Sequence, residues 1–246
     1  MKKLFVLIIA LSLTGGGLVA TVASYPVSVN GETLNVTVLN HNGTTYLPLK
    51  AVGQALGADV TWTGKSVEVN TVDVEELKKA CVSILAQNPK NGMQGSGVYV
   101  DYDEILTAQH VVNGMDRFTV NGYADLKLEN LSKDVDAAIL ETKHKEKPVK
   151  IGDSDEVEVG DRVVAVSAQG NIEDTITDAT VKAIEYVNRP DSSGGMHIVL
   201  NVALGEGASG CAIFDMNGCL VGMASMAESS INETYIIPIN QIREAL

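Results

Sequence analysis

Three residue types with the right neighbours for acyl transfer occur along this chain: a serine between glycines, a histidine and an aspartate. Ser209 lies in the segment Gly-Glu-Gly-Ala-Ser-Gly at 205–210, where glycine lets the backbone turn sharply. A serine hydroxyl becomes a nucleophile when a neutral imidazole takes its proton and a carboxylate fixes the imidazole tautomer. His110 and Asp136, each in an apolar run, supply those groups in the order His, Asp, Ser. The backbone N–H groups of Gly207 and Ser209 would stabilise the oxyanion.

Two aspartates could orient the histidine, because Asp134 and Asp136 both lie in Lys-Asp-Val-Asp at 133–136. Residues beyond 136 are apolar on both sides of an extended strand, so Asp136 is drawn into the interior. A buried charge needs a partner, and a histidine N–H would satisfy it. Asp134 is expected to be a turn residue.

The remaining candidate groups have simpler explanations. His144 lies in a charged run typical of a solvated loop, and His197 alternates with apolar residues as in a strand. Cys211 is an alternative nucleophile, but it follows the glycine turn and its neighbours are apolar. No cluster of His, Cys or carboxylates has metal-ligand spacing, so we expect no metal and no cofactor. The three cysteines are expected to be free, small buried hydrophobes.

Composition excludes several partner classes. The 246 residues carry a net charge of −13 and are 45% hydrophobic, which suits a globular protein with one larger and one smaller domain. Such a charge disfavours nucleic acid, whose phosphates need Lys and Arg, and anionic lipid. We therefore expect soluble partners.

The N-terminal residues 1–24 have the pattern of a secretory signal, with two lysines, an apolar core and small residues near Ser24. The alternative is an uncleaved membrane anchor, because the apolar stretch is about long enough to span a bilayer. Three consecutive glycines at 15–17 disfavour a spanning helix. We expect a secreted or cell-envelope-associated bacterial protein.

Residues 25–72 form a separate small α+β unit of short strands, turns at Asn30-Gly31 and Asn42-Gly43, and a helix that begins near Pro48 and ends at Gly57. This segment, with Tyr-Leu-Pro-Leu-Lys-Ala-Val at 46–52, resembles the copper amine oxidase N-terminal-like stalk domain. His41 is its only imidazole, and it has no Cys or Met, so no copper site is implied. The unit could contact the cell envelope.

The larger unit, residues 73–246, is expected to begin with a helix over 73–86, capped by Asp73 and Glu76. Many short strands with Gly, Asn and Asp turns follow, which indicates a mainly β protein of the barrel class.

Five motifs in order then resemble trypsin-like serine peptidases of the HtrA/DegP type: Gly-Ser-Gly-Val at 95–98, the runs around His110 and Asp136, Gly-Ala-Ser-Gly at 207–210, and Tyr-Ile-Ile-Pro at 235–238. The resemblance implies two six-stranded barrels of chymotrypsin type and no PDZ domain. It also implies an exported endopeptidase that hydrolyses peptide bonds through His110, Asp136, Ser209 and an acyl-enzyme.

The resemblance further implies that the strand edge at Met223, Ala224 and Ser225 pairs with the backbone of a protein or peptide substrate. Residues 201–206 would line the first specificity pocket, which favours small or medium apolar side chains. Gln109, Ala208 and Cys211 depart from the family pattern. They leave open a catalytically inactive, peptidase-fold binding module of the cell envelope.

Overall fold

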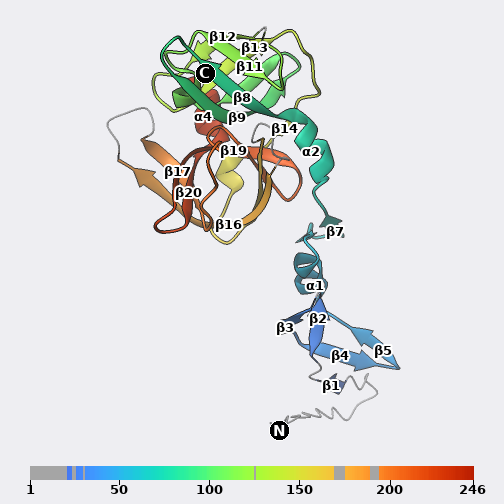
Figure 1. Cartoon of the computed structure of the whole chain (residues 1–246). Helices are drawn as coiled ribbons and strands as arrows, with labels where there is room; N and C mark the ends of the chain where they lie inside the picture. Colours follow the sequence, from blue (N-terminus) through green and yellow to red (C-terminus); the bar gives the residue numbers. More distant parts are fainter. Residues whose placement is uncertain (1–20, 24–25, 30, 125, 169–174, 189–193) are drawn as a thin grey trace. The chain divides into compact units, whose positions relative to one another are not determined.

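The computed structural model describes residues 21–23, 26–29, 31–124, 126–168, 175–188 and 194–246. The chain divides into two compact units between Thr71 and Val72 (Figure 1). The expected signal segment lies outside the described residues except for strand β1 (Thr21–Ala23). Among the described helices, none is long and apolar enough to cross a membrane.

The N-terminal unit consists of short antiparallel strand pairs and one helix. β4 pairs with β1 and β5, β2 pairs with β3, and β6 pairs with β7. Asn42 and Gly43 join β4 to β5 with positive φ at both residues, the geometry of a two-residue hairpin turn. The elements are β2 (Val27–Val29), β3 (Glu32–Leu34), β4 (Val38–His41), β5 (Thr44–Tyr46), α1 (Leu49–Ala55), β6 (Asp59–Trp62) and β7 (Val67–Asn70).

The second unit opens with a helix that is shorter than the sequence predicts. The Asp73 carboxylate accepts the N–H of Glu76 at 3.2 Å, as the capping motif requires, and α2 (Val74–Ala80) follows. The helix predicted over 73–86 is wrong beyond Ala80, because β8 (Cys81–Gln87) continues directly. Its residues pair with two neighbouring strands, and these ladder bonds outweigh the helical spacing of its apolar residues.

The first sheet of this unit is a six-stranded half-barrel in the order β11-β8-β9-β10-β13-β12. The short helix α3 (Gln109–Val112) follows β10 and lies next to β9. The strands are β9 (Gly92–Asp101), β10 (Glu104–Thr107), β11 (Arg117–Val120), β12 (Leu126–Leu131) and β13 (Ala138–Thr142).

The second sheet closes on itself, because β19 pairs with both β18 and β20. The order is β14-β19-β18-β15-β16-β17-β20, and α4 packs on β19 and β20. The elements are β14 (Lys150–Ile151), the 3₁₀ helix η1 (Ser154–Glu156), β15 (Arg162–Ser167), β16 (Thr175–Val187), β17 (Gly195–Leu200), β18 (Ala212–Asp215), β19 (Cys219–Glu228), β20 (Glu233–Pro238) and α4 (Ile239–Ala245). The predicted mainly β, two-barrel architecture is confirmed.

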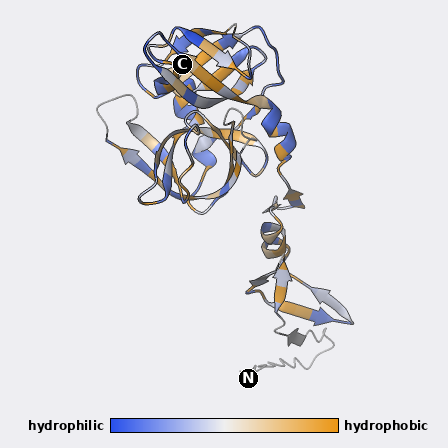
Figure 2. Cartoon of the chain, viewed as in Figure 1, coloured by the Kyte–Doolittle hydropathy of each residue, from blue (hydrophilic) through white to orange (hydrophobic). Residues whose placement is uncertain are grey.

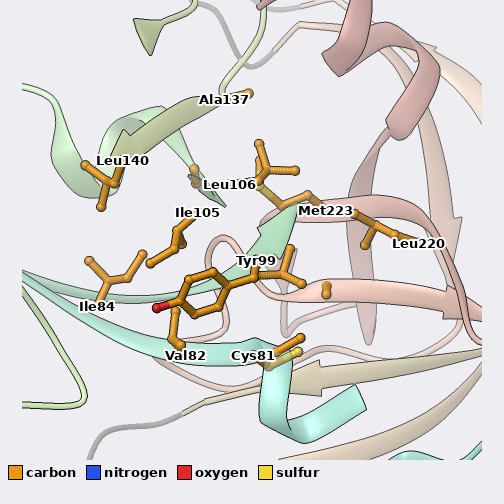
Figure 3. Close-up of a cluster of buried hydrophobic side chains, with 14 of the residues drawn as sticks. Cys81, Val82, Ile84, Tyr99, Ile105, Leu106, Ala137, Leu140, Leu220 and Met223 are labelled. Atoms are coloured by element: carbon orange, nitrogen blue, oxygen red, sulfur yellow. The ribbon is translucent and has the colours of Figure 1, made fainter. Parts of the chain in front are cut away.

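Apolar residues gather on the strands of both sheets, while the loops are hydrophilic (Figure 2). One core fills the second barrel, and the other joins the first sheet to the second. Figure 3 shows Leu220 and Met223 of β19 beside Leu106 of the first sheet. The two sheets therefore share a core, which fixes residues of one sheet relative to residues of the other.

Candidate active site

Asp136 lies in a turn that directs its side chain inward. The Ser132 hydroxyl accepts the N–H groups of Asp134 and Val135 at 3.2 and 3.1 Å, and the Ser132 N–H donates to Ala137 O at 3.0 Å. This turn leaves Asp134 exposed and Asp136 only 2% exposed. The burial of the two carboxylates differs in the predicted direction.

His110 is held against Asp136 by two hydrogen bonds. Its backbone N–H donates to Asp136 Oδ1 at 2.9 Å, and its ring Nδ1 lies 2.7 Å from Asp136 Oδ2. Val111 and Val112 anchor α3 in the core, while the His110 side chain remains 40% exposed. With Nδ1 donating to the carboxylate, Nε2 keeps the lone pair that a general base needs.

The hydrogen bond that His110 donates to Asp136 raises the pKa of His110 above its usual 6.5. Burial of the ring opposes this shift, and the negative charge of Asp136 adds to it. The pair therefore stabilises an imidazolium, the state in which a base is left after it has accepted a proton.

Ser225 has a role that sequence reasoning missed. It was expected to bind substrate, but its hydroxyl donates to Asp136 Oδ2 at 2.5 Å from the second barrel. Ser225 is 5% exposed, so this bond helps to satisfy the buried carboxylate. No local sequence signal could have revealed it, since the partners come from different sheets.

The turn that carries Ser209 docks on the first sheet. Gly207 and Gly210 have φ of 81° and 84°. A Cβ on Gly210 would lie 2.2 Å from Ser96 O and 2.7 Å from Thr107 Oγ1, so only glycine fits there. The predicted need for glycine in this turn is confirmed at this position by the close approach.

Ser209 and α3 are neighbours. A Cβ on Gly95 would lie within 3 Å of both Ser209 O and Val111 Cγ2. Val111 is the residue after His110, so Ser209 and α3 both lie against Gly95. Within the described chain, Ser209 Oγ and His110 share no hydrogen bond. Catalytic hydrogen bonds are often long before substrate binds, so this spacing is compatible with a nucleophile and its base.

The N–H groups of Gly207 and Ser209 remain available for an oxyanion. The flanking N–H groups of the turn have acceptors, because Ala208 N donates to Gly205 O and Gly210 N donates to Ala224 O. Across the residues that the structure describes, no protein acceptor takes the N–H of Gly207 or Ser209. Both residues can therefore donate to a bound group.

The predicted substrate-pairing edge needs correction. Met223 is fully buried in the shared core and pairs with both β18 and β20. Ala224 pairs with β20, and on its other side its N–H donates to Cys211 O while its carbonyl oxygen accepts the N–H of Gly210. Their backbones cannot add a substrate strand. The ladder shifts register after Ala224, and beyond that point β19 pairs with β20 alone among the described strands. The edge open to a peptide therefore begins at Ser225 and runs toward Ala227.

The loop after β17 is fixed by β20. Thr234 Oγ1 donates to Val202 O at 2.7 Å and accepts the N–H of Leu204 at 2.9 Å. Thr234 and Leu204 are buried, whereas Glu206 is exposed. These two bonds hold the segment that is predicted to line the first specificity pocket against β20.

Cys211 does not suit a nucleophile, because it is fully buried and burial raises the pKa of its thiol to about 12. None of the three cysteines forms a disulfide; Cys81 and Cys211 are buried as predicted, whereas Cys219 is only half-buried. His197 is buried within β17, and the ring of His144 stacks on Tyr123. In the described part of the chain, no group of three or more His, Cys, Asp or Glu residues could hold a metal.

Comparison with known proteins agrees with this geometry. The family model for the trypsin-like peptidase domain matches residues 95–223, and the model for the copper amine oxidase N-terminal domain matches residues 11–78. A probable periplasmic serine protease do/HhoA-like of Haemophilus influenzae is 32% identical over 60% of this chain and 34% of its own length. The periplasmic pH-dependent serine endoprotease DegQ of Escherichia coli is 28% identical over 69% of this chain and 40% of its own.

A solved structure shares the fold: a protease of M. tuberculosis in its active form superposes with a TM-score of 0.65 and 21% identity, covering 70% of this chain and 82% of that one. The chain spans well under half the length of the two curated relatives. The trypsin-like model, however, matches more than half of this chain. This protein therefore belongs to the trypsin-like peptidase family, with bacterial relatives of the HtrA/DegP type.

Proposed function

We propose that this protein is an exported serine endopeptidase that cleaves proteins or peptides outside the cytoplasm. The observation that carries the proposal is the buried carboxylate of Asp136, which binds His110 through two hydrogen bonds while the His110 side chain stays 40% exposed. A buried acid, an oriented base and a serine on a glycine turn form the set that acyl transfer requires.

In the proposed reaction, Ser209 Oγ attacks the carbonyl carbon of the scissile peptide bond while His110 Nε2 accepts the hydroxyl proton. The oxyanion that forms accepts hydrogen bonds from the N–H groups of Gly207 and Ser209. Collapse breaks the C–N bond, and His110 gives its proton to the leaving amine. Water then attacks the acyl-enzyme in the same way, which releases the acid and restores Ser209.

The substrate would lie along the open edge of β19 that begins at Ser225. An extended peptide can add to such an edge through main-chain hydrogen bonds, with side chains directed into pockets on alternate sides. No aspartate stands among residues 201–206 to bind a basic side chain, so we expect small or medium apolar side chains before the scissile bond. The N-terminal unit would contact the cell envelope rather than take part in the reaction.

A fluorophosphonate probe tests this proposal, because it reacts covalently only with an activated serine. Folded wild-type protein should be labelled, Ser209→Ala should not be labelled, and Asp134→Asn should be labelled like wild type. The alternative is a binding module that keeps the peptidase fold without activity. Absence of labelling in folded wild-type protein would establish that alternative and overturn the proposal.

A further inference from the structure

Ser96 of β9 forms hydrogen bonds with three residues of the second barrel: Ala168, Gly207 and Ser209. It is fully buried. Its N–H donates to Ser209 O at 2.8 Å, and its hydroxyl oxygen lies 2.8 Å from Gly207 O. The same hydroxyl lies 3.1 Å from Ala168 N and 3.2 Å from Ala168 O. Ser96 therefore contacts both residues whose N–H groups would stabilise the oxyanion.

The direction of these bonds follows from counting protons. A serine hydroxyl has one proton to donate and can also accept. The Ala168 N–H must donate to Ser96 Oγ, so the hydroxyl proton goes to a carbonyl oxygen. Gly207 O is the nearer acceptor, at 2.8 Å against 3.2 Å for Ala168 O. Ser96 Oγ thus donates to Gly207 O while it accepts from Ala168.

The Gly207 turn needs such an anchor. Glycine adopts positive and negative φ with similar ease, so the observed φ of 81° at Gly207 is not enforced by its own side chain. A rotation of this turn would point the Gly207 N–H away from the oxyanion. The hydrogen bond from Ser96 fixes the 207–208 peptide through its carbonyl oxygen and so holds the Gly207 Cα, to which the peptide that bears this N–H is attached. On the other side, the N–H of Ser96 fixes the carbonyl oxygen of Ser209.

The position of Ser96 is itself closely defined. Thr107 Oγ1 donates to Ser96 O at 2.7 Å, and Thr107 is fully buried. A Cβ on Gly97 would lie 2.7 Å from Ile84 Cδ1, so the flanking glycines let β9 approach its neighbours closely. Ser96 is thus fixed within the first sheet and, through its hydrogen bonds, fixes the position of the oxyanion turn relative to that sheet.

We propose that Ser96 is a positioning residue that holds the oxyanion turn in its productive conformation. The proposal rests on the proposed peptidase function and goes beyond it. According to this proposal, the oxyanion site of the second barrel keeps its conformation because Ser96 of the first barrel donates a hydrogen bond to it. The alternative is a merely structural serine, whose removal would lower stability without a specific effect on the chemical step.

Ser96→Ala tests the proposal with Ser154→Ala as a matched control. Ser154 of η1 is also buried, and its hydroxyl accepts the N–H of Asn240 of α4 rather than a bond from the Ser209 turn. Peptide hydrolysis by Ser96→Ala should show kcat about 10- to 100-fold lower with KM within about threefold, somewhat less than loss of an oxyanion donor. A peptide boronate or aldehyde, which forms a tetrahedral adduct, should lose affinity by a similar factor.

Ser154→Ala should lower the melting temperature by a comparable amount and leave kcat within about twofold. If Ser96→Ala does not fold, Ser96→Cys replaces it, because the thiol has similar size and is a weak donor. Ser96→Cys should fold, and its kcat should also fall, but by a smaller factor than that expected for Ser96→Ala.

The outcomes separate this proposal from the proposed function. If the wild type is active and the folded Ser96 variants keep kcat within about twofold of the Ser154→Ala value, Ser96 is structural and only this proposal is overturned. A change confined to KM would overturn it equally. If folded wild-type protein neither reacts with the fluorophosphonate probe nor hydrolyses peptides, there is no oxyanion to stabilise, and both proposals are overturned.

Discussion

The two units of this chain differ in how much of their apolar surface they bury. In the N-terminal unit, the described buried residues are Val38, Gly53, Ala58 and Val60. Several of its large apolar side chains are exposed, among them Trp62 at 66% and Leu56 at 60%. The second unit has two extended cores, and every residue of the candidate active site lies in it. Close packing is therefore concentrated where chemistry requires fixed geometry, and substitutions in the two units should have very different consequences.

The largest effect is expected at the carboxylate that orients His110. Asp136→Asn should lower kcat by about 10⁴-fold, because the amide would hold the imidazole in the wrong tautomer. Asp134→Asn should lower it less than about tenfold, since Asp134 is exposed and bonds only within its own turn. Steady-state peptide hydrolysis by folded variants at neutral pH measures both values. The reverse ranking would exclude Asp136 as the orienting group.

The next effect compares two glycines with almost the same backbone conformation. Gly210 has φ of 84°, and its missing Cβ would collide with Ser96 O, whereas Gly57 has φ of 82° and no atom within 4 Å of that position. Gly210→Ala should lower kcat/KM by about 100-fold or more, because the Ser209 turn must move. Gly57→Ala should leave kcat/KM unchanged and lower only the stability of the N-terminal unit, by about 1–2 kcal/mol.

Peptide hydrolysis and thermal unfolding of both glycine variants make the comparison. Full activity of Gly210→Ala would show that the turn tolerates a side chain at this position. A loss of activity in Gly57→Ala would show that the N-terminal unit influences the site.

The pH dependence should show a smaller effect within the second unit. Protonated His110 cannot accept the Ser209 proton, so activity falls as pH drops through the pKa of His110. The hydrogen bond that His110 donates to Asp136 raises that pKa, so the acid limb of kcat/KM should have its midpoint above 6.5. Residual activity of Asp136→Asn should have its midpoint at lower pH. A wild-type midpoint below 6.5 would contradict the assigned pairing.

Part of the site could be predicted because its signals are local. The apolar residues on both sides of the strand beyond Asp136 predict its burial, and the glycines around Ser209 predict a tight turn. The expected mainly β, two-barrel class also agrees with the structure. These inferences need only neighbouring residues, whose chemistry determines the local backbone.

The rest depends on contacts between distant segments. The bond of Ser225 to Asp136 could not be predicted, because it joins residues of different sheets and the register shift after Ala224 has no signature in the sequence. The predicted helix extends through Cys81 to Ala86 because apolar residues at helical spacing also suit a strand that is buried between neighbours. The bonds of Ser96 to the oxyanion turn join the two barrels, and its place between two glycines is the only hint that the sequence provides.

The smallest effect is expected from removing the N-terminal unit. A protein that begins at Val72 keeps α2, both cores and every hydrogen bond of the candidate site. Because domains with their own core fold alone, this shortened protein should retain kcat/KM within about twofold of the full chain. Trp62→Ala in the full chain is the matched control and should change neither activity nor the unfolding of the second unit. Peptide hydrolysis and fluorophosphonate labelling of the two proteins measure the difference. Complete loss of activity in a shortened protein that still folds would show that residues 25–72 are needed for catalysis. The division into a loosely packed unit and a catalytic unit would then no longer hold.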